Sequence, residues 1–289
     1  MRATGRFGVF SGRASISQAS GGTRPLVIAI HGGTYTSAYF DVDGHSLLDQ
    51  AERNGITAIA IDRYGYGKTP FIDDMSILGQ AALLSGALND VWTQYRADAN
   101  GVVLIGHSIG AAIALGVAGN PGELPLLGIA VSGIGVRTPA AHSAMWNSLP
   151  DLPTVEMPAA VKDQLMFGPP GSFDPAVAAA SHATDAPVPK AELIDIVGGW
   201  QAQAAAICSS VRVPVHYRQA EQDRLWIVDK DEVEAFARRF SAAPRVDAAM
   251  IRNTGHCMEL HAVGPALQLQ QLGFALQCAV ERPSSGDGT

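Results

Sequence analysis

The stretch Gly106-His107-Ser108-Ile109-Gly110 places a serine between two glycines, at a spacing suited to nucleophilic chemistry. The apolar run Gly101–Ile105 precedes it and the small residues Ala111–Ala118 follow, which predicts a strand, a sharp turn and a helix. The glycines are expected because a Cβ there would collide with a neighbouring strand or helix. The turn holds the Ser108 hydroxyl clear of the sheet, near the N–H groups that begin the helix. We expect Ser108 to attack a carbonyl carbon.

A pair of glycines after the strand predicted at Leu26–Ile30 offers a place for developing negative charge. His31-Gly32-Gly33-Thr34 follows that strand directly. Glycines let the backbone turn at a strand end and approach a ligand closely. The amide of Gly33 or Thr34, together with that of Ile109, is suited to receive an oxyanion, and losing one such donor typically costs ~10²–10³ in rate. We therefore expect an oxyanion hole here.

An acid and a histidine follow two further predicted strands. Asp223 lies just past the strand at Val213–Tyr217, and His256 follows the strand at Val246–Ile251. A carboxylate in that place can hold an imidazole in the correct tautomer and stabilise its charged form. The chain order serine, aspartate, histidine is the one expected for a nucleophile on a turn of this kind. We expect His256 to be the base and Asp223 to orient it.

Four other residues compete for these roles. Glu221 lies close to the end of its strand, and Asp229 has the position of a helix N-cap. His261 falls within or beside the final helical region. The side chain of His107, next to the serine, is expected to point away from the site. Asp223 and His256 therefore remain the preferred pair.

The overall composition excludes several function classes. Hydrophobic residues make up 47% of the 289 residues, charged residues 16%, and the formal net charge is −7. The sequence contains no basic cluster, so a nucleic-acid partner is not expected. The longest apolar stretches are strand-sized and too short to span a bilayer. Met1–Phe10 carries charges but no apolar core, so we expect no signal peptide.

The three cysteines, Cys208, Cys257 and Cys278, are widely spaced. They form neither a disulfide framework nor a CxxC pair, which favours a reducing, cytoplasmic setting. Cys257 adjoins a histidine, but a buried inert thiol is the preferred interpretation. The sequence implies no metal and no organic cofactor. It carries no signal for an oligomeric state.

Alternating strands and helices must position the candidate residues. After an edge hairpin at Phe7–Ser17, we expect strands at Leu26–Ile30, Thr57–Ile61, Gly101–Ile105, Leu126–Val131, Val213–Tyr217 and Val246–Ile251. Helices are expected late in Thr34–Asn54 and at Ile77–Tyr95, Ala111–Ala118, Asp231–Phe240 and Pro265–Val280. This alternation predicts an α/β fold with a mostly parallel sheet covered on both faces. Ligands then bind at the carboxyl ends of the strands.

Residues 136–211 interrupt this alternation. Helix-like pieces near Ala159–Met166, Pro175–Ser181 and Ala191–Ala206 are separated by joints rich in proline and glycine. We interpret the segment as a helical cap inserted into a core domain formed by residues 1–135 and 212–282. Residues 283–289 are predicted to be a disordered tail.

The chain resembles the α/β-hydrolase superfamily, in particular its members with a helical cap. The resemblance rests on His31-Gly32-Gly33, Asp62-Arg63-Tyr64-Gly65-Tyr66-Gly67, Gly106–Gly110, Asp223 and Gly255-His256, and it covers essentially the whole chain. It implies a sheet of about eight strands whose first hairpin is antiparallel. The Asp62 stretch is similar to a structural loop of the family, so Asp62 is not a catalytic candidate. Haloalkane dehalogenases and epoxide hydrolases use aspartate as the nucleophile, and the serine here disfavours their chemistry.

The resemblance implies a serine hydrolase that forms an acyl-enzyme. We expect the substrate to be a small to medium, uncharged, largely apolar carboxylic ester. Aromatic and sulfur-containing side chains are candidates for its pocket, because ligand sites are mostly apolar with few polar groups. The six candidates are Tyr35, His107, Trp146, Met166, Phe167 and Trp226. Most large apolar side chains of the cap are expected simply to pack it onto the core.

Two other classes of function stay open. One is a different reaction on the same three residues: hydrolysis of a lactone, a thioester or a carbon–carbon bond, or perhydrolysis. The other is a ligand-binding, receptor-like protein with slow turnover. The sequence alone does not separate them, since the nucleophile, acid and base are shared.

Overall fold

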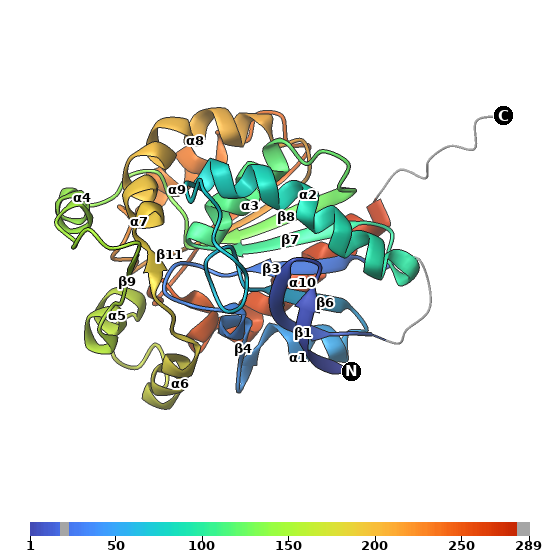
Figure 1. Cartoon of the computed structure of the whole chain (residues 1–289), viewed down its shortest axis with the longest axis horizontal. Coiled ribbons are helices and arrows are strands. Elements are labelled where there is room, and N and C mark those ends of the chain that lie inside the picture. The colour runs from blue at the N-terminus through green and yellow to red at the C-terminus, as the bar shows by residue number, and fades with distance from the viewer. Residues whose placement is uncertain (18–22, 282–289) are drawn as a thin grey trace.

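A single eight-stranded sheet forms the centre of the molecule (Figure 1). The structure is a computed structural model that describes residues 1–17 and 23–281. The strands lie in the order β1 (Arg2–Phe7), β2 (Phe10–Ser15), β6 (Thr57–Ile61), β3 (Leu26–Ile30), β7 (Val102–His107), β8 (Leu126–Ser132), β11 (Val215–Ala220) and β12 (Val246–Ile251). Strand β2 is antiparallel to both neighbours, and all other neighbouring pairs are parallel. The expected α/β-hydrolase sheet is confirmed.

Helices cover both faces of this sheet (Figure 1). One face packs against α2 (Ile77–Tyr95), α3 (Ile109–Gly119), α8 (Gly199–Ser210) and α9 (Lys230–Ala237). The other packs against α1 (Leu47–Arg53) and α10 (Gly264–Glu281). In β3, Leu26, Ile28 and Ile30 face the first group, while Val27 and Ala29 face the second. The strand is apolar throughout because both of its faces are buried.

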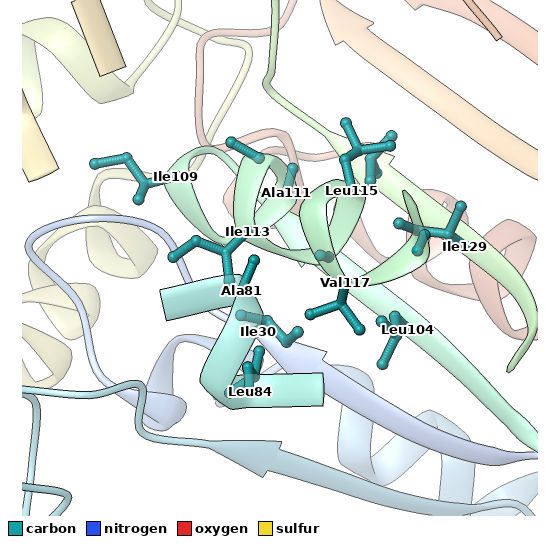
Figure 2. Packing of buried hydrophobic residues seen from close by; sticks show 14 of the residues in the cluster. Ile30, Ala81, Leu84, Leu104, Ile109, Ala111, Ile113, Leu115, Val117 and Ile129 are labelled. Carbon is teal, nitrogen blue, oxygen red and sulfur yellow. The ribbon is translucent and has the colours of Figure 1, made fainter. Parts of the chain in front are cut away.

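Helix α3 is the most deeply packed of these helices. Figure 2 shows its side chains between residues of α2, such as Ala81, and strand residues such as Leu104 and Ile129. A Cβ at Gly116 would lie 2.7 Å from the Cβ of Ala81, so glycine permits α2 and α3 to approach closely. The helix begins directly after Ser108, so this packing fixes the position of the serine turn.

The segment between β8 and β11 lies over the carboxyl ends of the strands. It contains α4 (Ala140–Asn147), β9 (Thr154–Val155), α5 (Ala159–Met166), α6 (Pro175–Ser181), β10 (Val188–Pro189), α7 (Lys190–Val197) and then α8. The short strands β9 and β10 pair with each other. Helix α8 differs from the rest because its buried residues Ala204, Ile207 and Cys208 join the core beside α3. The last helix of the predicted cap therefore packs on the core domain.

Several predicted boundaries are wrong. The edge hairpin begins at Arg2 rather than Phe7, and it turns at Gly8, whose φ is +60°. The helix expected at Ala191–Ala206 is two helices that meet at Gly198. Strand β11 starts at Val215 and extends to Ala220, beyond the predicted Tyr217.

Two further expectations concern the C-terminal tail and membrane-spanning helices. The predicted disordered tail, residues 283–289, lies outside the described residues. Within residues 1–17 and 23–281, no helix is long and apolar enough to cross a bilayer.

Candidate active site

Ser108 occupies a strained turn between β7 and α3. Its φ of +56° and ψ of −125° are rare for a residue with a side chain. A Cβ at Gly106 would lie 2.7 Å from the Cα of Ala111, and one at Gly110 would lie 2.2 Å from the carbonyl oxygen of Ile30. Both clashes involve backbone, so the two glycines are required for the reason that the sequence suggested.

A chain of short contacts connects Ser108, His256 and Asp223. The Nε2 atom of His256 lies 2.8 Å from Oγ of Ser108, and its Nδ1 atom lies 2.8 Å from Oδ2 of Asp223. His256 is 1% exposed, and Ser108 retains 9% exposure. In this arrangement the serine hydroxyl can donate to Nε2 while Nδ1–H donates to the carboxylate. The structure thus brings together the three residues that the sequence singled out.

The Asp223 carboxylate is held in place by the loop that follows β11. Its Oδ1 atom accepts a hydrogen bond from the amide of Leu225 at 2.9 Å, and Oδ2 accepts one from Nε2 of Gln219 at 3.3 Å. The side chain has no exposed area. A buried carboxylate with these donors is fixed in position and presents its remaining acceptor capacity to His256.

The competing acids and His261 have structural contacts instead. Glu221 accepts from the amide of Asn253 at 2.8 Å, and Asp229 caps α9 as predicted. His261 accepts from the amides of Gly168 and Gly255 at 2.9 Å each and lies 2.8 Å from the carbonyl oxygen of Cys257 through Nδ1. It therefore connects the His256 loop to the segment between β8 and β11.

The glycine turn after β3 lies against the serine. A Cβ at Gly32 would be 3.0 Å from the Cβ of Ser108, and one at Gly33 would be 3.1 Å from Cδ1 of Ile109. Ile109 is the first residue of α3, so its amide has no acceptor within the helix. Thr34 has a φ of +64°, which continues the tight turn. The amides of Gly33, Thr34 and Ile109 thus belong to backbone that surrounds Ser108.

A buried polar cluster lies behind His256. The ring of His107 is 4.9 Å from the His256 ring and stacks on Tyr39. Tyr39 donates to Oε2 of Glu259 at 2.7 Å, and the hydroxyl of Ser132 donates to Oε1 of the same carboxylate. Burial, and to a lesser extent His256, holds the pKa of His107 well below 6.5, so this ring is neutral. Glu259 carries no local signal of this role, because its partners Tyr39 and Ser132 are far away along the chain.

A small, apolar cavity of about 50 Å³ opens beside Ser108. The segment between β8 and β11 contributes residues from α4, α5 and α7, and the rest of the lining includes the glycine turn and the loop after Asp223. Its lining is Gly33, Thr34, Ser108, Ile109, Thr138, His142, Trp146, Met157, Met166, Leu193, Ile196, Val197, Leu225 and Trp226. This cavity is far below the roughly 300–1,000 Å³ of sites for drug-sized ligands.

Three of the six predicted pocket residues line this cavity, namely Trp146, Met166 and Trp226. The other three do not. The buried hydroxyl of Tyr35 lies 3.4 Å from Sγ of Cys257, and Phe167 packs between Phe173 and His261. His107 lies in the polar cluster behind His256. All three side chains point into the interior, where they contact other buried side chains.

Neither a reactive thiol at Cys257 nor a metal site accompanies these residues in the described part of the chain. Burial raises the pKa of the Cys257 thiol to about 12, so it is protonated at neutral pH. Within the described ranges, no three His, Cys, Asp or Glu side chains are grouped so that they could hold a metal ion.

Comparisons with known proteins agree with this fold. A family model described as "Alpha/beta hydrolase family" matches residues 27–265. A monoacylglycerol lipase from Paleococcus ferrophilus superimposes with a TM-score of 0.69 at 12% identity, covering 93% of this chain and 99% of its own. A carboxyl esterase from Bacillus coagulans, solved with glycerol, gives 0.68 at 16% identity, with 97% and 99% coverage.

A third structure, an esterase from Exiguobacterium antarcticum, gives a TM-score of 0.64 at 15% identity and covers 92% of this chain and 96% of its own. Identities this low establish the shared fold and not the substrate. No curated protein sequence matches the chain significantly.

Proposed function

The chain belongs to the α/β-hydrolase family, and on that premise we propose that it hydrolyses small, uncharged carboxylic esters through a Ser-His-Asp triad. The observation that carries this proposal is the pair of 2.8 Å contacts that connect Ser108 to His256 and His256 to Asp223 at the edge of the cavity. This combination of nucleophile, base and orienting acid is one that performs acyl transfer.

The reaction begins when Ser108 attacks the ester carbonyl. His256 accepts the hydroxyl proton at Nε2, and Asp223 stabilises the imidazolium that results. The amides of Ile109 and of Gly33 or Thr34 receive the oxyanion of the tetrahedral intermediate. His256 then gives its proton to the leaving alcohol, and an acyl-Ser108 remains.

Water completes the cycle. His256 removes a proton from the water molecule as that water attacks the acyl carbon. The second tetrahedral intermediate then collapses, and His256 returns the proton to Oγ of Ser108 as the acid is released. No step calls for a metal or an organic cofactor, because the serine is the nucleophile and the backbone amides stabilise the charge.

The cavity supports the choice of substrate. No Asp, Glu, Lys or Arg side chain lines it in the described part of the chain. A charged substrate group would therefore lose its hydration without gaining a partner, which is unfavourable. The small volume favours a short acyl or alcohol group. The three free, buried cysteines suit the reducing cytoplasm that we propose as the location.

A series of p-nitrophenyl esters from acetate to dodecanoate tests this function. We expect turnover of the short members, a loss of kcat/KM with increasing length, and no turnover by Ser108→Ala. Ser209→Ala, at an exposed serine, is the control and retains full activity. If wild-type protein cleaves none of the esters, the proposal is wrong. Lactones, acyl thioesters and a fluorophosphonate then distinguish another hydrolase from a slow ligand-binding protein.

A further inference from the structure

The guanidinium of Arg63 holds the carbonyl groups of the turn that carries the proposed oxyanion donors. Arg63 follows β6 and is 1% exposed. Its Nε atom donates to the carbonyl oxygen of His31 at 2.8 Å, and its Nη2 atom donates to that of Gly32 at 3.2 Å. The Arg63 amide donates to Nε2 of His31 at 3.1 Å. One arginine therefore fixes two successive peptide groups of this turn.

Fixing the Gly32 carbonyl also fixes the Gly33 amide. These two groups belong to the same peptide bond, which is planar and trans, so C=O and N–H point in opposite directions. The Gly32 oxygen is held by Arg63 and also lies 2.8 Å from Nδ1 of His31, whose ring in turn accepts from the Arg63 amide. The Gly33 N–H is therefore turned away from Arg63. A Cβ on the neighbouring Gly32 would lie 3.0 Å from the Cβ of Ser108, so the peptide lies directly against the serine. This geometry favours Gly33 over Thr34 as the oxyanion donor.

Arg63 is in turn held by a residue of the cap segment. Glu192, on α7, is fully buried and accepts from Nη1 and Nη2 of Arg63 at 2.6 and 2.9 Å. Such a bidentate pair fixes the plane of the guanidinium. Nη1 also donates to Oε1 of Gln80 at 2.9 Å, so all five guanidinium N–H groups have an acceptor. Burial opposes the charge on Arg63, but the charges and hydrogen bonds of Glu192 and Tyr66 together outweigh burial and raise the pKa of Arg63, so Arg63 remains charged.

The Glu192 carboxylate is equally well satisfied. Besides Arg63, it accepts from Nε2 of Gln80 at 2.8 Å and from the Tyr66 hydroxyl at 2.9 Å. When every donor and acceptor of a buried ion pair has a partner, the pair is held in one geometry rather than several. The neighbouring α7 residues Leu193 and Ile196 line the cavity. The same helix therefore forms a wall of the pocket and supports the oxyanion turn.

We propose that Glu192 is a positioning residue for the oxyanion hole. It acts through Arg63, whose guanidinium orients the Gly32–Gly33 peptide toward the reacting carbonyl. The oxyanion hole is then complete only when α7 is docked on the core. A second contact supports this coupling, because the amide of Ala186, before α7, donates to the Thr34 carbonyl at 2.9 Å. The inference rests on the proposed esterase function.

Glu192→Gln tests the proposal in the full chain. Because the variant weakens the hold on Arg63, we expect kcat for p-nitrophenyl acetate to fall by about 10²-fold, the size typical of a lost oxyanion donor, with KM nearly unchanged. Affinity for a trifluoromethyl ketone, which mimics the tetrahedral intermediate, should fall by the same factor. A role in folding alone would not separate kcat from KM in this way.

Asp195→Ala is the matched control. Asp195 lies on the same helix and accepts from the Ile77 amide of α2 at 2.8 Å, but its described hydrogen bonds include none to the oxyanion turn. Asp195→Ala therefore removes one contact between α7 and α2 and keeps the contacts of Glu192 with Arg63. Tyr66→Phe removes one donor to Glu192 and serves as a milder variant if Glu192→Gln does not fold. We expect it to lower kcat and the ketone affinity together.

The results separate two kinds of failure. If wild-type protein hydrolyses no ester, the proposed function is wrong. If wild type is active but Glu192→Gln lowers kcat no more than Asp195→Ala does, or raises KM instead, the positioning role is overturned. The positioning role is also overturned if the folded Tyr66→Phe protein has wild-type kcat and wild-type affinity for the ketone.

Discussion

The Nδ1 atom of His256 lies 2.8 Å from Oδ2 of Asp223, and both side chains are buried. Asparagine at position 223 would keep the acceptor for the Leu225 amide but would present the wrong hydrogen-bonding group to the imidazole. We expect Asp223→Asn to fold normally and to lose about 10⁴-fold in kcat, as removal of this charge does in other triads. Steady-state kinetics with a short ester measure the loss.

Glu221→Gln is the control for this prediction. Glu221 lies two residues away and contacts the amide of Asn253 rather than the histidine. The variant should keep wild-type kcat. A large loss of kcat in Glu221→Gln, with little loss of kcat in Asp223→Asn, would show that Asp223 is not the orienting acid.

The nucleophile turn has no room for a side chain at Gly110. A Cβ there would lie 2.2 Å from the carbonyl oxygen of Ile30 and 2.3 Å from that of His31. Gly110→Ala must therefore displace the oxyanion turn or α3, and we expect loss of both activity and stability. Thermal unfolding and ester hydrolysis provide the readouts.

Gly273→Ala is the corresponding control, because a Cβ at this exposed position of α10 meets nothing within 4 Å. Alanine is favoured over glycine inside a helix by roughly 1 kcal/mol. This variant should be stabilised and fully active. A Gly110→Ala protein with wild-type stability and rate would show that the turn is not constrained as described.

Local patterns predicted much of the fold. Helix α2 was predicted to the residue, because an apolar face repeats along Ile77–Tyr95 and Ser76 caps its first turn by accepting from the Gly79 amide. Strands such as Leu26–Ile30 are uniformly apolar and buried on both faces, so their limits coincide with the limits of the apolar run. The positions of the proposed triad follow from strand ends and chain order.

Features that depend on distant contacts were not predictable. Strand β11 continues through the polar Arg218 because that side chain pairs with Asp247 on β12. Glu192 carries no local sign of its role, since its partner Arg63 lies 129 residues away. The aromatic Tyr35 is predicted to line the pocket, but the direction of its side chain depends on how the following loop packs.

The size of the cavity should depend on Ile196, which lines it from α7. Ile196→Ala enlarges the apolar space beside Ser108, so we expect the preferred p-nitrophenyl ester to become longer. Ile194→Ala on the same helix is the control, because Ile194 is 38% exposed and does not line the cavity. Unchanged chain-length preference in Ile196→Ala would exclude this cavity as the acyl or alcohol site.

Acid stability should depend on His216, a buried residue of β11. Burial, followed by the nearby Arg218, lowers the pKa of His216 from 6.5 to about 4. The unfolded chain therefore takes up a proton between pH 6.5 and 4 that the folded protein does not, so stability falls as pH falls through that range. His216→Leu removes this loss.

We expect the stability advantage of His216→Leu over wild type to be about 2 kcal/mol larger at pH 5 than at pH 8. Urea unfolding at the two pH values measures it. If the unfolding free energies of His216→Leu and wild type differed by the same amount at both pH values, the lowered pKa of His216 would be contradicted.

The most direct measurement of the central claim is labelling with a fluorophosphonate followed by peptide mass spectrometry. We predict one adduct per chain, on the peptide that contains Ser108, with loss of ester hydrolysis in proportion to labelling. His256→Ala should label far more slowly, since the hydroxyl loses its base. An adduct on another residue, or a Ser108→Ala protein that hydrolyses esters at the wild-type rate, would contradict the assignment of Ser108 as the nucleophile.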